Sequence, residues 1–437
     1  MPPESGLGYK LNAAVSGAIG ALMFILPSVT GPVAGLGGPG LGHHDATAVR
    51  PPAAARAVLN TGLFATACTA PGSCAAGGDF GAARRPLEPM VATQSHGRWS
   101  RAIPLLLPPN AAAQPYAVVN GIACRNAGNC VAVGNYDYGR SSNLQAFIAT
   151  ESHGTWARAF TPRLPANASS PASAQLQAVT CTRGGYCEAV GSYQDSAGNA
   201  QTMTLAKAPT GPWRQAAEVA SPPGAAANPD ALMTGIACTS PGSCVAVGNY
   251  SLSASRFAAM GAIESRGTWR QAVQIALPRG AIPSTFTAIT SVTCPGPAAG
   301  PCTGVGEYAV SATRSRAMTV TESKGRFGRA VAITAVPPGA SPVSSTYLLG
   351  VSCAPAGTCL AVGGGRNLAG RSVAMYMTRS GGHWRAAFLL PPRGATAGRR
   401  QGSALYSVSC TGRAHCTAVG YYRDHLGAPH AQAASTP

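Results

Sequence analysis

Acidic residues and lysine are scarce in this sequence. Its 437 residues contain 14 Asp and Glu against 32 Lys and Arg, a formal net charge of +18, and the only lysines are Lys10, Lys207 and Lys324. Two interpretations of the arginine excess stay open. It attracts anionic polymers such as cell-wall phosphates, acidic glycans or extracellular nucleic acid, or it is a solvated surface biased by the codon usage of a high-GC genome. The arginines form no basic run with interleaved aromatics.

Several catalytic and cofactor-binding motifs are also absent. The sequence has no G-x-S-x-G nucleophile elbow and no H-E-x-x-H helix, and its eight histidines are scattered. The segment Gly35–Gly40 formally fits G-x-G-x-x-G, but no predicted strand precedes it and no helix follows it. It is therefore expected to be a flexible spacer. We expect no cofactor, no metal site and no catalytic residue of these classes.

The cysteine pattern leaves no cysteine without a nearby partner. The 14 cysteines form seven pairs, which are Cys68/Cys74, Cys124/Cys130, Cys181/Cys187, Cys238/Cys244, Cys294/Cys302, Cys353/Cys359 and Cys410/Cys416. The first cysteines of successive pairs lie 56, 57, 57, 56, 59 and 57 residues apart. This period indicates an array of one repeated unit, rather than the two or three domains that length alone suggests.

Each cysteine pair is interpreted as a local disulfide. Complete pairing is typical of an oxidising compartment. A zinc site would need C-x2-C-type pairs with two further ligands, and only Cys416 has an adjacent histidine, His415. Opposed Cα atoms of an antiparallel pair lie about 4.5 to 5.5 Å apart, within reach of a disulfide. The sequence therefore predicts seven hairpins, each closed by a disulfide that contributes about 2 kcal/mol.

The N-terminus has the layout of a secretory signal. Lys10 precedes the apolar stretch Leu11–Pro27, and a Gly- and Pro-rich segment follows up to Gly42. The alternative is an uncleaved membrane anchor, although Pro27 interrupts the stretch below the roughly 18 apolar residues that a spanning helix needs. Residues 1–35 are predicted to be this signal peptide or anchor with its linker. The mature protein is expected to be secreted or extracytoplasmic, associated with the cell envelope.

The residues around each cysteine pair predict two adjacent strands. A large apolar residue lies five positions before the first cysteine and a small residue three before it, as in Val119 and Gly121. Ala-Val-Gly-x-Tyr follows the second cysteine in the clearest copies, and a glycine within a strand indicates a bulge or a close backbone approach. That glycine is present in all seven copies, as Gly78, Gly134, Gly191, Gly248, Gly306, Gly363 and Gly420.

Two further strands are predicted in each copy. A third strand, for example Gln145–Thr150 or Gln201–Ala206, leads to a turn, and a fourth strand carries an aromatic residue and runs on to a proline-rich linker. The Gly-x-aromatic elements use all five tryptophans, expected as core residues, and are Gly97/Trp99, Gly154/Trp156, Gly211/Trp213, Gly267/Trp269, Gly325/Phe327 and Gly382/Trp384. Four short antiparallel strands per copy are typical of a β-propeller blade.

The two ends of the repeat array complement each other. The last copy stops after a third strand at His430–Thr436, and residues 42–52 match a fourth strand with its Pro-Pro, with His44 in place of the aromatic. The sequence thus predicts an all-β, seven-bladed β-propeller over residues 42–437, closed by an N-terminal strand. The alternative, an open solenoid, leaves the last copy unpaired. The predicted repeats are residues 61–116, 117–173, 174–230, 231–286, 287–345, 346–402 and 403–437 with 42–52.

Two resemblances follow from these motifs. The repeat core, as in Val351–Gly363, resembles the cysteine-paired repeats of secreted actinobacterial proteins of unknown function, over residues 61–437. The turn Glu151–Trp156 resembles the Asp-box of sialidase-type propellers, but it has one residue instead of two between Gly and Trp, and Glu where Asp belongs. An Asp-box is a structural turn, so this resemblance implies kinship in fold and not hydrolysis.

Most acidic residues recur at equivalent repeat positions, which indicates structural roles. The exceptions are Glu188, Glu218, Asp230 and Glu307. Two of these would form a catalytic pair only if adjacent blades brought them within about 5 to 10 Å. The Arg triad and Tyr-Glu pair that the sialidase resemblance implies do not map onto this chain. Whether the protein is an enzyme is left open, with a non-enzymatic role favoured.

An arginine closely follows the aromatic residue of the fourth strand in six copies. Either these arginines form a basic belt around the rim, or they are a charged outer strand that blocks edge-to-edge association. They are Arg101, Arg158, Arg214, Arg270, Arg329 and Arg385.

The patterns favour a binding or scaffold module at the cell envelope or outside the cell. The longest and most variable loops join fourth to first and second to third strands, so a ligand face is expected there, around the axis. Its candidates are Tyr116, Phe286, Tyr347, Arg399 and Arg400 from the former loops, with Arg140 and Arg366 from the latter. The expected partner is an anionic cell-wall polymer, a glycan or a protein, and the chain is expected to be a monomer. The alternative is a sialidase-like enzyme acting on an envelope polysaccharide.

Overall fold

The described part of the chain consists of short antiparallel strands. The computed structural model describes residues 46–53, 60–81, 86–139, 143–282, 287–296, 300–340, 345–354, 357–389, 402–412 and 415–436. Within these ranges there is no helix that is both long and apolar enough to cross a bilayer. The predicted signal or anchor segment, residues 1–35, lies outside them.

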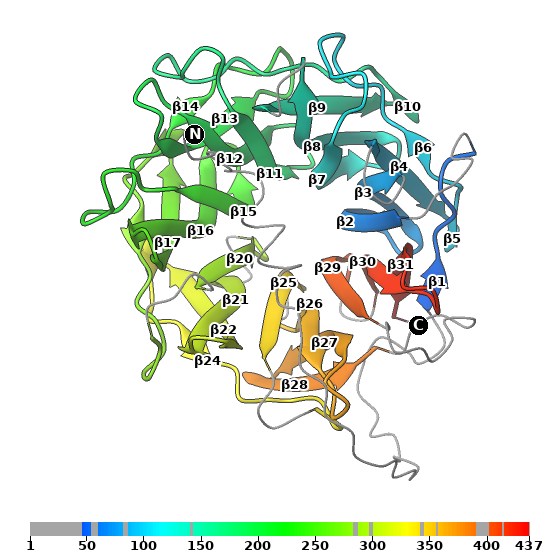
Figure 1. The fold of residues 1–437 in the computed structure, drawn as a ribbon, viewed down its shortest axis with the longest axis vertical. Helices are drawn as coiled ribbons and strands as arrows, with labels where there is room; N and C mark the ends of the chain where they lie inside the picture. The colour runs from blue at the N-terminus through cyan, green and yellow to red at the C-terminus, as the bar shows by residue number, and fades with distance from the viewer. Residues whose placement is uncertain are drawn as a thin grey trace.

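Seven small sheets stand around a common axis, as a seven-bladed β-propeller (Figure 1). The innermost strands are β2 (Asn60–Ala70), β7 (Ala117–Asn126), β11 (Ala174–Cys181), β15 (Leu232–Ser240), β20 (Ala288–Thr293), β25 (Thr346–Cys353) and β29 (Ser403–Cys410). The second strands are β3 (Ser73–Gly81), β8 (Asn129–Tyr138), β12 (Cys187–Gln194), β16 (Ser243–Ser253), β21 (Cys302–Ser311), β26 (Cys359–Arg366) and β30 (Cys416–Arg423).

The third strands pair with the second strands on the side away from the axis. They are β4 (Leu87–Ser95), β9 (Asn143–Ser152), β13 (Ala200–Lys207), β17 (Arg256–Ser265), β22 (Arg314–Ser323), β27 (Ser372–Ser380) and β31 (Pro429–Ser435). The outermost strands are β5 (Arg98–Trp99) with β6 (Ile103–Pro104), β10 (Thr155–Trp156), β14 (Ala217–Glu218), β18 (Thr268–Trp269) with β19 (Val273–Gln274), β23 (Arg326–Phe327) with β24 (Val331–Ala332), β28 (His383–Phe388) and β1 (Ala46–Ala48).

A β-bulge in every innermost strand explains the glycine that recurs after each cysteine pair. In blade 2 the register between β7 and β8 shifts between Val119 and Gly121, which leaves Asn120 as the extra residue. The shift brings the Val118 carbonyl oxygen so close to Gly134 that a Cβ there would collide with it. The corresponding carbonyl blocks a side chain at the equivalent glycine of the other six blades. The predicted close backbone approach is confirmed.

All seven predicted cysteine pairs form disulfides across the first hairpin of their blade. The bonds are Cys68–Cys74, Cys124–Cys130, Cys181–Cys187, Cys238–Cys244, Cys294–Cys302, Cys353–Cys359 and Cys410–Cys416. The two cysteines of blade 2, for example, are directly opposed in the register of β7 and β8. The disulfides therefore lie together at one end of the propeller, and the loops between second and third strands lie at the other end.

The cysteine pairs differ from the sequence-based description in two respects. The Cα atoms of Cys124 and Cys130 lie 4.0 Å apart, closer than the expected 4.5 to 5.5 Å or so. Cys130 is also only 3% exposed and belongs to the hydrophobic cluster between blades 1 and 2, against which its partly buried partner Cys124 packs. Cys130 is therefore a core residue as well as a disulfide residue. The sequence did not predict this, because part of the surface that buries Cys130 belongs to the neighbouring blade.

The same burial recurs at the second cysteine of the other pairs. These buried cysteines are Cys74, Cys187, Cys244, Cys302, Cys359 and Cys416. Each disulfide thus closes its own hairpin and also fills part of the contact between blades.

The predicted fourth strand is interrupted in most blades, because its backbone turns to bond the neighbouring blade. In blade 1, β5 and β6 both pair with β4, but between them the Ala102 N–H donates to the Arg50 carbonyl of the preceding blade. The N–H groups of Ala159, Ala216, Ala272 and Ala330 make the same bond in blades 2 to 5. Each such bond joins neighbouring blades at the rim.

The N-terminal strand closes the ring. Strand β1 pairs with β31, with Thr47 opposite Ala433, so the last blade has the order β1-β31-β30-β29. Figure 1 shows the blue β1 beside the red β31. His44, expected in place of the aromatic, lies outside the described residues.

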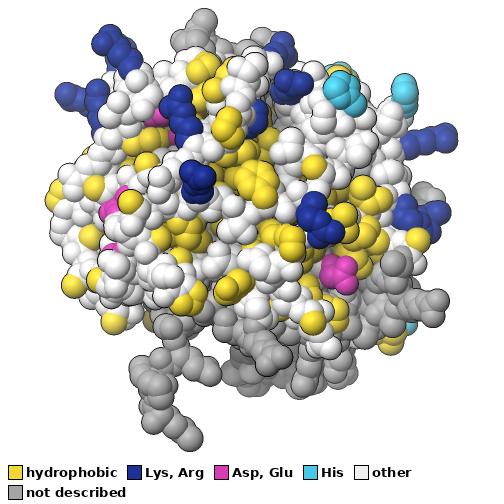
Figure 2. Space-filling model, turned by 90° about the horizontal axis from the view of Figure 1, so that it is seen from above, with side chains coloured by type: hydrophobic (Ala, Val, Ile, Leu, Met, Phe, Trp, Pro, Cys, Tyr) yellow, Lys and Arg dark blue, Asp and Glu magenta, His cyan; other side chains and the backbone are white. Residues whose placement is uncertain are grey.

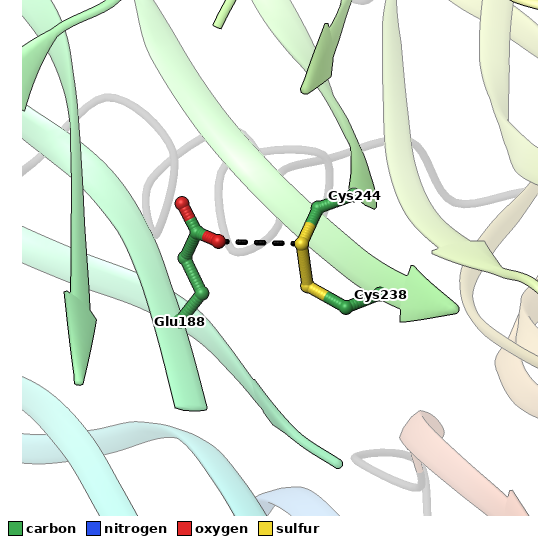
Figure 3. Close-up of side chains that lie close together, drawn as sticks. All are labelled: Glu188, Cys238 and Cys244. Atoms are coloured by element: carbon green, nitrogen blue, oxygen red, sulfur yellow. Dashed lines mark hydrogen bonds between the residues drawn. A yellow bond between two sulfur atoms is a disulfide. The ribbon is translucent and has the colours of Figure 1, made fainter. Parts of the chain in front are cut away.

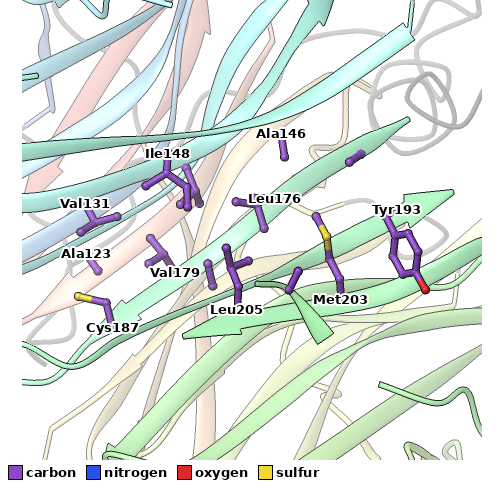
Figure 4. Packing of buried hydrophobic residues seen from close by; sticks show 14 residues of the cluster. Ala123, Val131, Ala146, Ile148, Leu176, Val179, Cys187, Tyr193, Met203 and Leu205 are labelled. Atoms are coloured by element: carbon purple, nitrogen blue, oxygen red, sulfur yellow. The ribbon is translucent and has the colours of Figure 1, made fainter. Parts of the chain in front are cut away.

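The hydrophobic core consists of clusters between adjacent blades. Figure 4 shows one of them, in which Val131 and Ile148 of blade 2 pack against Leu176 and Leu205 of blade 3. The predicted core role of the tryptophans is seen in the same cluster, where the half-buried Trp213 packs against it. Each blade thus needs its neighbours to bury its faces.

Candidate functional site

Three repeat positions place side chains near the axis at the end of the propeller away from the disulfides. One lies six residues before the first cysteine, one is the bulge residue four before it, and one directly follows the recurrent glycine. The first and third positions are directly opposed across the inner two strands, as Val118 and Asn135 are. We call them the axial positions, and their residues differ from blade to blade.

In blades 2 to 4 the axial positions carry mainly amides and hydroxyls, and those of blades 2 and 3 bond one another. Asn120 donates from Nδ2 to Asn135 Oδ1 and to the Leu176 carbonyl, both at 2.9 Å. Gln177 donates to Gln175, which donates to Ser192. We call this region, Asn120, Asn135, Gln175, Gln177, Ser192, Thr234 and Asn249, the amide half. Most of its polar groups are thus satisfied within the protein, and the exception among the described residues is the buried Asn249 Oδ1.

In blades 5 to 7 and blade 1 the same positions carry aromatic rings and carboxyls. The Phe64 ring meets the Tyr406 ring edge-on at 4.9 Å between centroids, and Tyr406 stacks on Tyr421 at 5.9 Å. The Arg423 guanidinium lies 5.6 Å from the centre of the Tyr421 ring, a cation–π distance. We call Phe64, Asp79, Glu307, Tyr347, Tyr406 and Tyr421 the aromatic–acid cluster.

The two carboxyls of this cluster, Asp79 and Glu307, have pKa values raised to near neutral pH. Burial raises the pKa of Asp79 to about 7. Burial also raises the pKa of Glu307 to about 7, although a hydrogen bond from Ser315 opposes the shift. Both side chains remain partly accessible to solvent while protein atoms surround them. Each therefore exists in both protonation states near pH 7, and can donate or accept a hydrogen bond.

The tyrosine hydroxyls lie in the same electrostatic environment. The pKa of Tyr347 is raised by burial and by Tyr421 and Glu307, against the opposing charge of Arg366. The pKa of Tyr406 is raised well above its usual value by burial, with contributions from Tyr421, Tyr347 and Asp79. Side chains from four blades thus act on one another at the axis.

A glycine makes room for one of the rings. A Cβ on Gly364 would collide with the hydroxyl of Tyr347, its directly opposed residue in β25 and β26. The other blades carry Asp79, Asn135, Ser192, Asn249, Glu307 or Tyr421 at this position. The Tyr347 ring can therefore occupy its place only because blade 6 has glycine at position 364.

The predicted ligand-face residues are only partly within this site. Tyr347 belongs to the aromatic–acid cluster, and Arg366, at the end of β26, acts on it electrostatically. Tyr116 lies instead at the start of blade 2, where it bridges to Leu87 of blade 1. Arg140, Phe286, Arg399 and Arg400 lie outside the described residues.

The unrepeated acids do not form one catalytic group. Glu218 in β14 accepts hydrogen bonds from the Tyr193 hydroxyl at 2.7 Å and from Asn167, so it holds a linker. Asp230 has a positive φ of 42° in a linker turn. Glu307 alone belongs to the axial site, where Asp79 joins it. Asp79 was not predicted, although it and Glu307 are the only acids among the seven residues that directly follow the recurrent glycines.

Glu188 lies between blades 3 and 4 near the disulfide end. It is 1% exposed and accepts hydrogen bonds from Tyr186, Thr204 and Trp269 at 2.7 to 2.8 Å. Figure 3 shows its carboxylate against the disulfide of Cys238 and Cys244, with Oε2 3.2 Å from the Cys244 sulfur. These three residues lie close enough to hold a metal ion, but the sulfurs are bonded to each other and are not thiolate ligands.

Three of the six rim arginines donate hydrogen bonds to the preceding blade. Arg101, Arg158 and Arg329 donate from Nη1 to the carbonyls of Pro51, Leu107 and Leu277, at 2.7 to 3.2 Å. Gln215 and Gln271 make the equivalent bond in blades 3 and 4. Figure 2 shows Lys and Arg scattered singly over one side of the rim. These contacts give the outer arginines a structural role beside their charge.

Comparison with known proteins adds a likeness in structure. No protein-family model matches the chain, and no curated protein sequence matches it. Among solved structures, a Hadza microbial sialidase is 11% identical with a TM-score of 0.45, covering 87% of this chain and 66% of its own. A Trypanosoma rangeli sialidase is 8% identical with a TM-score of 0.47, covering 87% and 55%.

A protein of unknown function from Dyadobacter fermentans is 10% identical with a TM-score of 0.45, covering 76% of this chain and 96% of its own. The chain thus spans about half to two thirds of the length of the sialidases it resembles.

Proposed function

We propose that the protein is an extracytoplasmic binding module, and that the aromatic–acid cluster binds a polyhydroxylated ligand such as a glycan. Aromatic rings offer flat apolar surfaces, and tyrosine hydroxyls, carboxyls and a guanidinium offer directed hydrogen bonds. Binding sites combine apolar and aromatic walls with a few polar groups in this way. Seven disulfides support an oxidising compartment, and attachment to the cell envelope and a monomeric state are part of the proposal.

The observation that carries the proposal is the difference between the two halves of the axis. The amide half shows that the repeat positions can be filled by groups that satisfy one another. The blades opposite instead place two carboxyls of raised pKa beside partly exposed aromatic surface. Burying carboxyls beside aromatic rings costs free energy, because the carboxyls lose contact with water. A role in binding a ligand would explain why the protein keeps this arrangement.

The test is a glycan and cell-wall fragment array probed with oxidised, folded protein. Anionic polymers belong on the same array, because the arginine excess also predicts them as partners. A ligand found there is then titrated by calorimetry against two variants at the same bulge position. Tyr406→Ala is expected to weaken binding about 30-fold, as loss of a central aromatic contact does. Gln177→Ala, the matched control in the amide half, is expected to stay within about threefold. Equal effects of the two variants would contradict the proposal.

A second candidate function is glycoside hydrolysis at the same site. It is favoured by the carboxyls, since a pKa of about 7 for Asp79 and Glu307 suits general acid–base catalysis near neutral pH. The test is release of a chromogenic aglycone from aryl glycosides, sialosides included. Glu307→Gln should abolish turnover if the site is catalytic, and should leave binding within about tenfold. Absence of turnover with every glycan that binds would leave the binding module as the function.

A further inference from the structure

A cavity lies at the disulfide end of the propeller, between blades 4 and 5. It has a volume of about 350 Å³ and is lined by Glu264 and Arg270 of blade 4, by Glu322 and Lys324 of blade 5, and by both blades' disulfides. This volume is in the range of small-molecule sites. None of the residues that line it belongs to the aromatic–acid cluster.

Glu264 is the buried polar group of this cavity. It is 6% exposed, and within the described residues no hydrogen-bond donor satisfies its Oε2 atom. Its neighbour is Glu188, which already accepts three hydrogen bonds from other groups. Burial and the Glu188 carboxylate raise the pKa of Glu264 to about 8. The Glu264 carboxyl is therefore largely protonated near pH 7, and a cation bound beside it would favour its ionised form.

The other charged groups of the cavity are not paired with one another. The Glu322 carboxylate accepts the Gly325 N–H at 2.8 Å, and Arg270 reaches across to blade 5, where Nη1 lies 4.0 Å from the place of a Cβ on Gly325. Among the described residues, the one ion pair within 4 Å is His430 with Asp424, far from here in the sequence. Two acidic and two basic sites thus line one cavity without neutralising each other directly.

An equivalent cavity between blades 7 and 1 shows that these charges are not required by the fold. It has a volume of about 230 Å³, with Thr436 in the place of Glu264 and Gln94 in the place of Glu322. The equivalent hairpin turns and disulfides of blades 7 and 1 enclose it. Of these two cavities, only the one between blades 4 and 5 is lined by both acids and bases.

We propose that the cavity between blades 4 and 5 binds a small zwitterion, with its ammonium group at Glu264 and Glu322 and its anionic group at Arg270 and Lys324. A ligand with one charge of each sign can place each charge beside groups of the opposite sign, whereas a simple cation or anion would leave one kind of lining group without a counter-charge. An amino acid or an amino-substituted organic acid has this chemistry.

The probes are glycine, β-alanine and 4-aminobutanoate, with ethylamine and propionate as controls of a single charge. Titrations of the full folded protein are followed by ¹H–¹⁵N chemical shifts of the amides of Ile263, Lys324 and Gly325. At least one zwitterion is expected to saturate at a concentration about tenfold lower than either control. No saturable shift with any zwitterion, or equal binding of ethylamine, would overturn the proposal.

Variants separate this site from its neutral counterpart. Glu264→Gln and Lys324→Gln are each expected to weaken zwitterion binding about tenfold. Lys324 lies in an exposed turn, so its variant keeps the test valid if loss of Glu264 disturbs the Glu188 contact. Gln94→Ala, in the cavity between blades 7 and 1, is expected to leave binding unchanged. Unchanged binding in both charge variants, or shifts that map equally to the neutral cavity, would refute the proposal.

Discussion

The amide half and the aromatic–acid cluster have the same backbone arrangement but present two kinds of surface at the axial positions. In the amide half, Asn120, Gln177 and their neighbours bond one another and leave few groups for a ligand. In blades 5 to 7 and blade 1, rings from Phe64, Tyr406 and Tyr421 gather beside Asp79 and Glu307. The bulge and its glycine are the same in both halves. The comparison teaches that the repeat sets the backbone, while the axial side chains are free to specialise.

The largest expected effect is on positions that the two halves share. Gly134→Ala in the amide half and Gly420→Ala in the opposite half would each place a Cβ against a backbone carbonyl, so both should lower the free energy of unfolding by about 3 kcal/mol or more. Urea denaturation measures this. The control is Gly365→Ala, where a Cβ meets only ordinary van der Waals contacts and the change should stay within about 1 kcal/mol. Wild-type stability of Gly134→Ala would show that the bulge does not constrain the fold.

A smaller change in the free energy of unfolding is expected when the pH is varied, and it should arise from the carboxyls of the aromatic–acid cluster. The pKa values of Asp79 and Glu307 are raised to about 7 in the folded state from 3.8 and 4.5. Their contribution is therefore complete below pH 4 and is lost as the pH rises through 7. The loss is expected to stay well below the limit of about 1.4 kcal/mol per pH unit for each group, because solvent reaches both side chains and screens them.

Unfolding free energies measured between pH 4 and 8 check this slope. The double variant Asp79→Asn with Glu307→Gln should flatten it, leaving the decline due to Glu264, whose pKa is about 8. Asn135→Ala in the amide half should shift the curve without changing its slope. An unchanged slope in the double variant would mean that the two carboxyls are ionised in the folded protein.

The smallest effect is expected at the rim, where the two halves should behave alike. Arg158→Ala and Arg101→Ala each remove a hydrogen bond to the preceding blade and should lower the free energy of unfolding by about 1 kcal/mol. Arg158→Gln should restore most of the loss, since Gln215 makes this bond in blade 3. Thermal denaturation compares the three. If the glutamine were as damaging as alanine, charge rather than the hydrogen bond would be the stabilising feature.

Much of the fold could be predicted from the sequence, because the repeat is local. The cysteine spacing determines the hairpins, and residues 46–48 pair with the last blade as the end-matching argument expected. The interrupted fourth strand could not be predicted, since the bond from Ala102 to Arg50 joins two blades. The burial of Cys130 was missed for the same reason, because its cluster includes residues of the neighbouring blade. No local pattern marks such contacts.

The site was harder to predict than the fold, because its residues meet across the ring. Tyr347 and Arg366 were predicted in loops, but Tyr347 lies within β25 and Arg366 at the end of β26, where the charge of Arg366 acts on Tyr347. Tyr406 and Asp79 were not selected, because they belong to strands in blades 7 and 1 whose neighbourhood exists only after the ring closes. Alignment of the copies on the recurrent glycine gives the one sequence signal for Asp79.

The most direct test of the account is to record which half of the axis a bound glycan touches. In ¹H–¹³C spectra of the aromatic rings, titration with a glycan from the array should shift the signals of Tyr347, Tyr406 and Tyr421. The side-chain amide signals of Asn120 and Gln177 should remain in place. Shifts confined to those amides, with the tyrosine signals unmoved, would contradict the assignment of the ligand site to the aromatic–acid cluster.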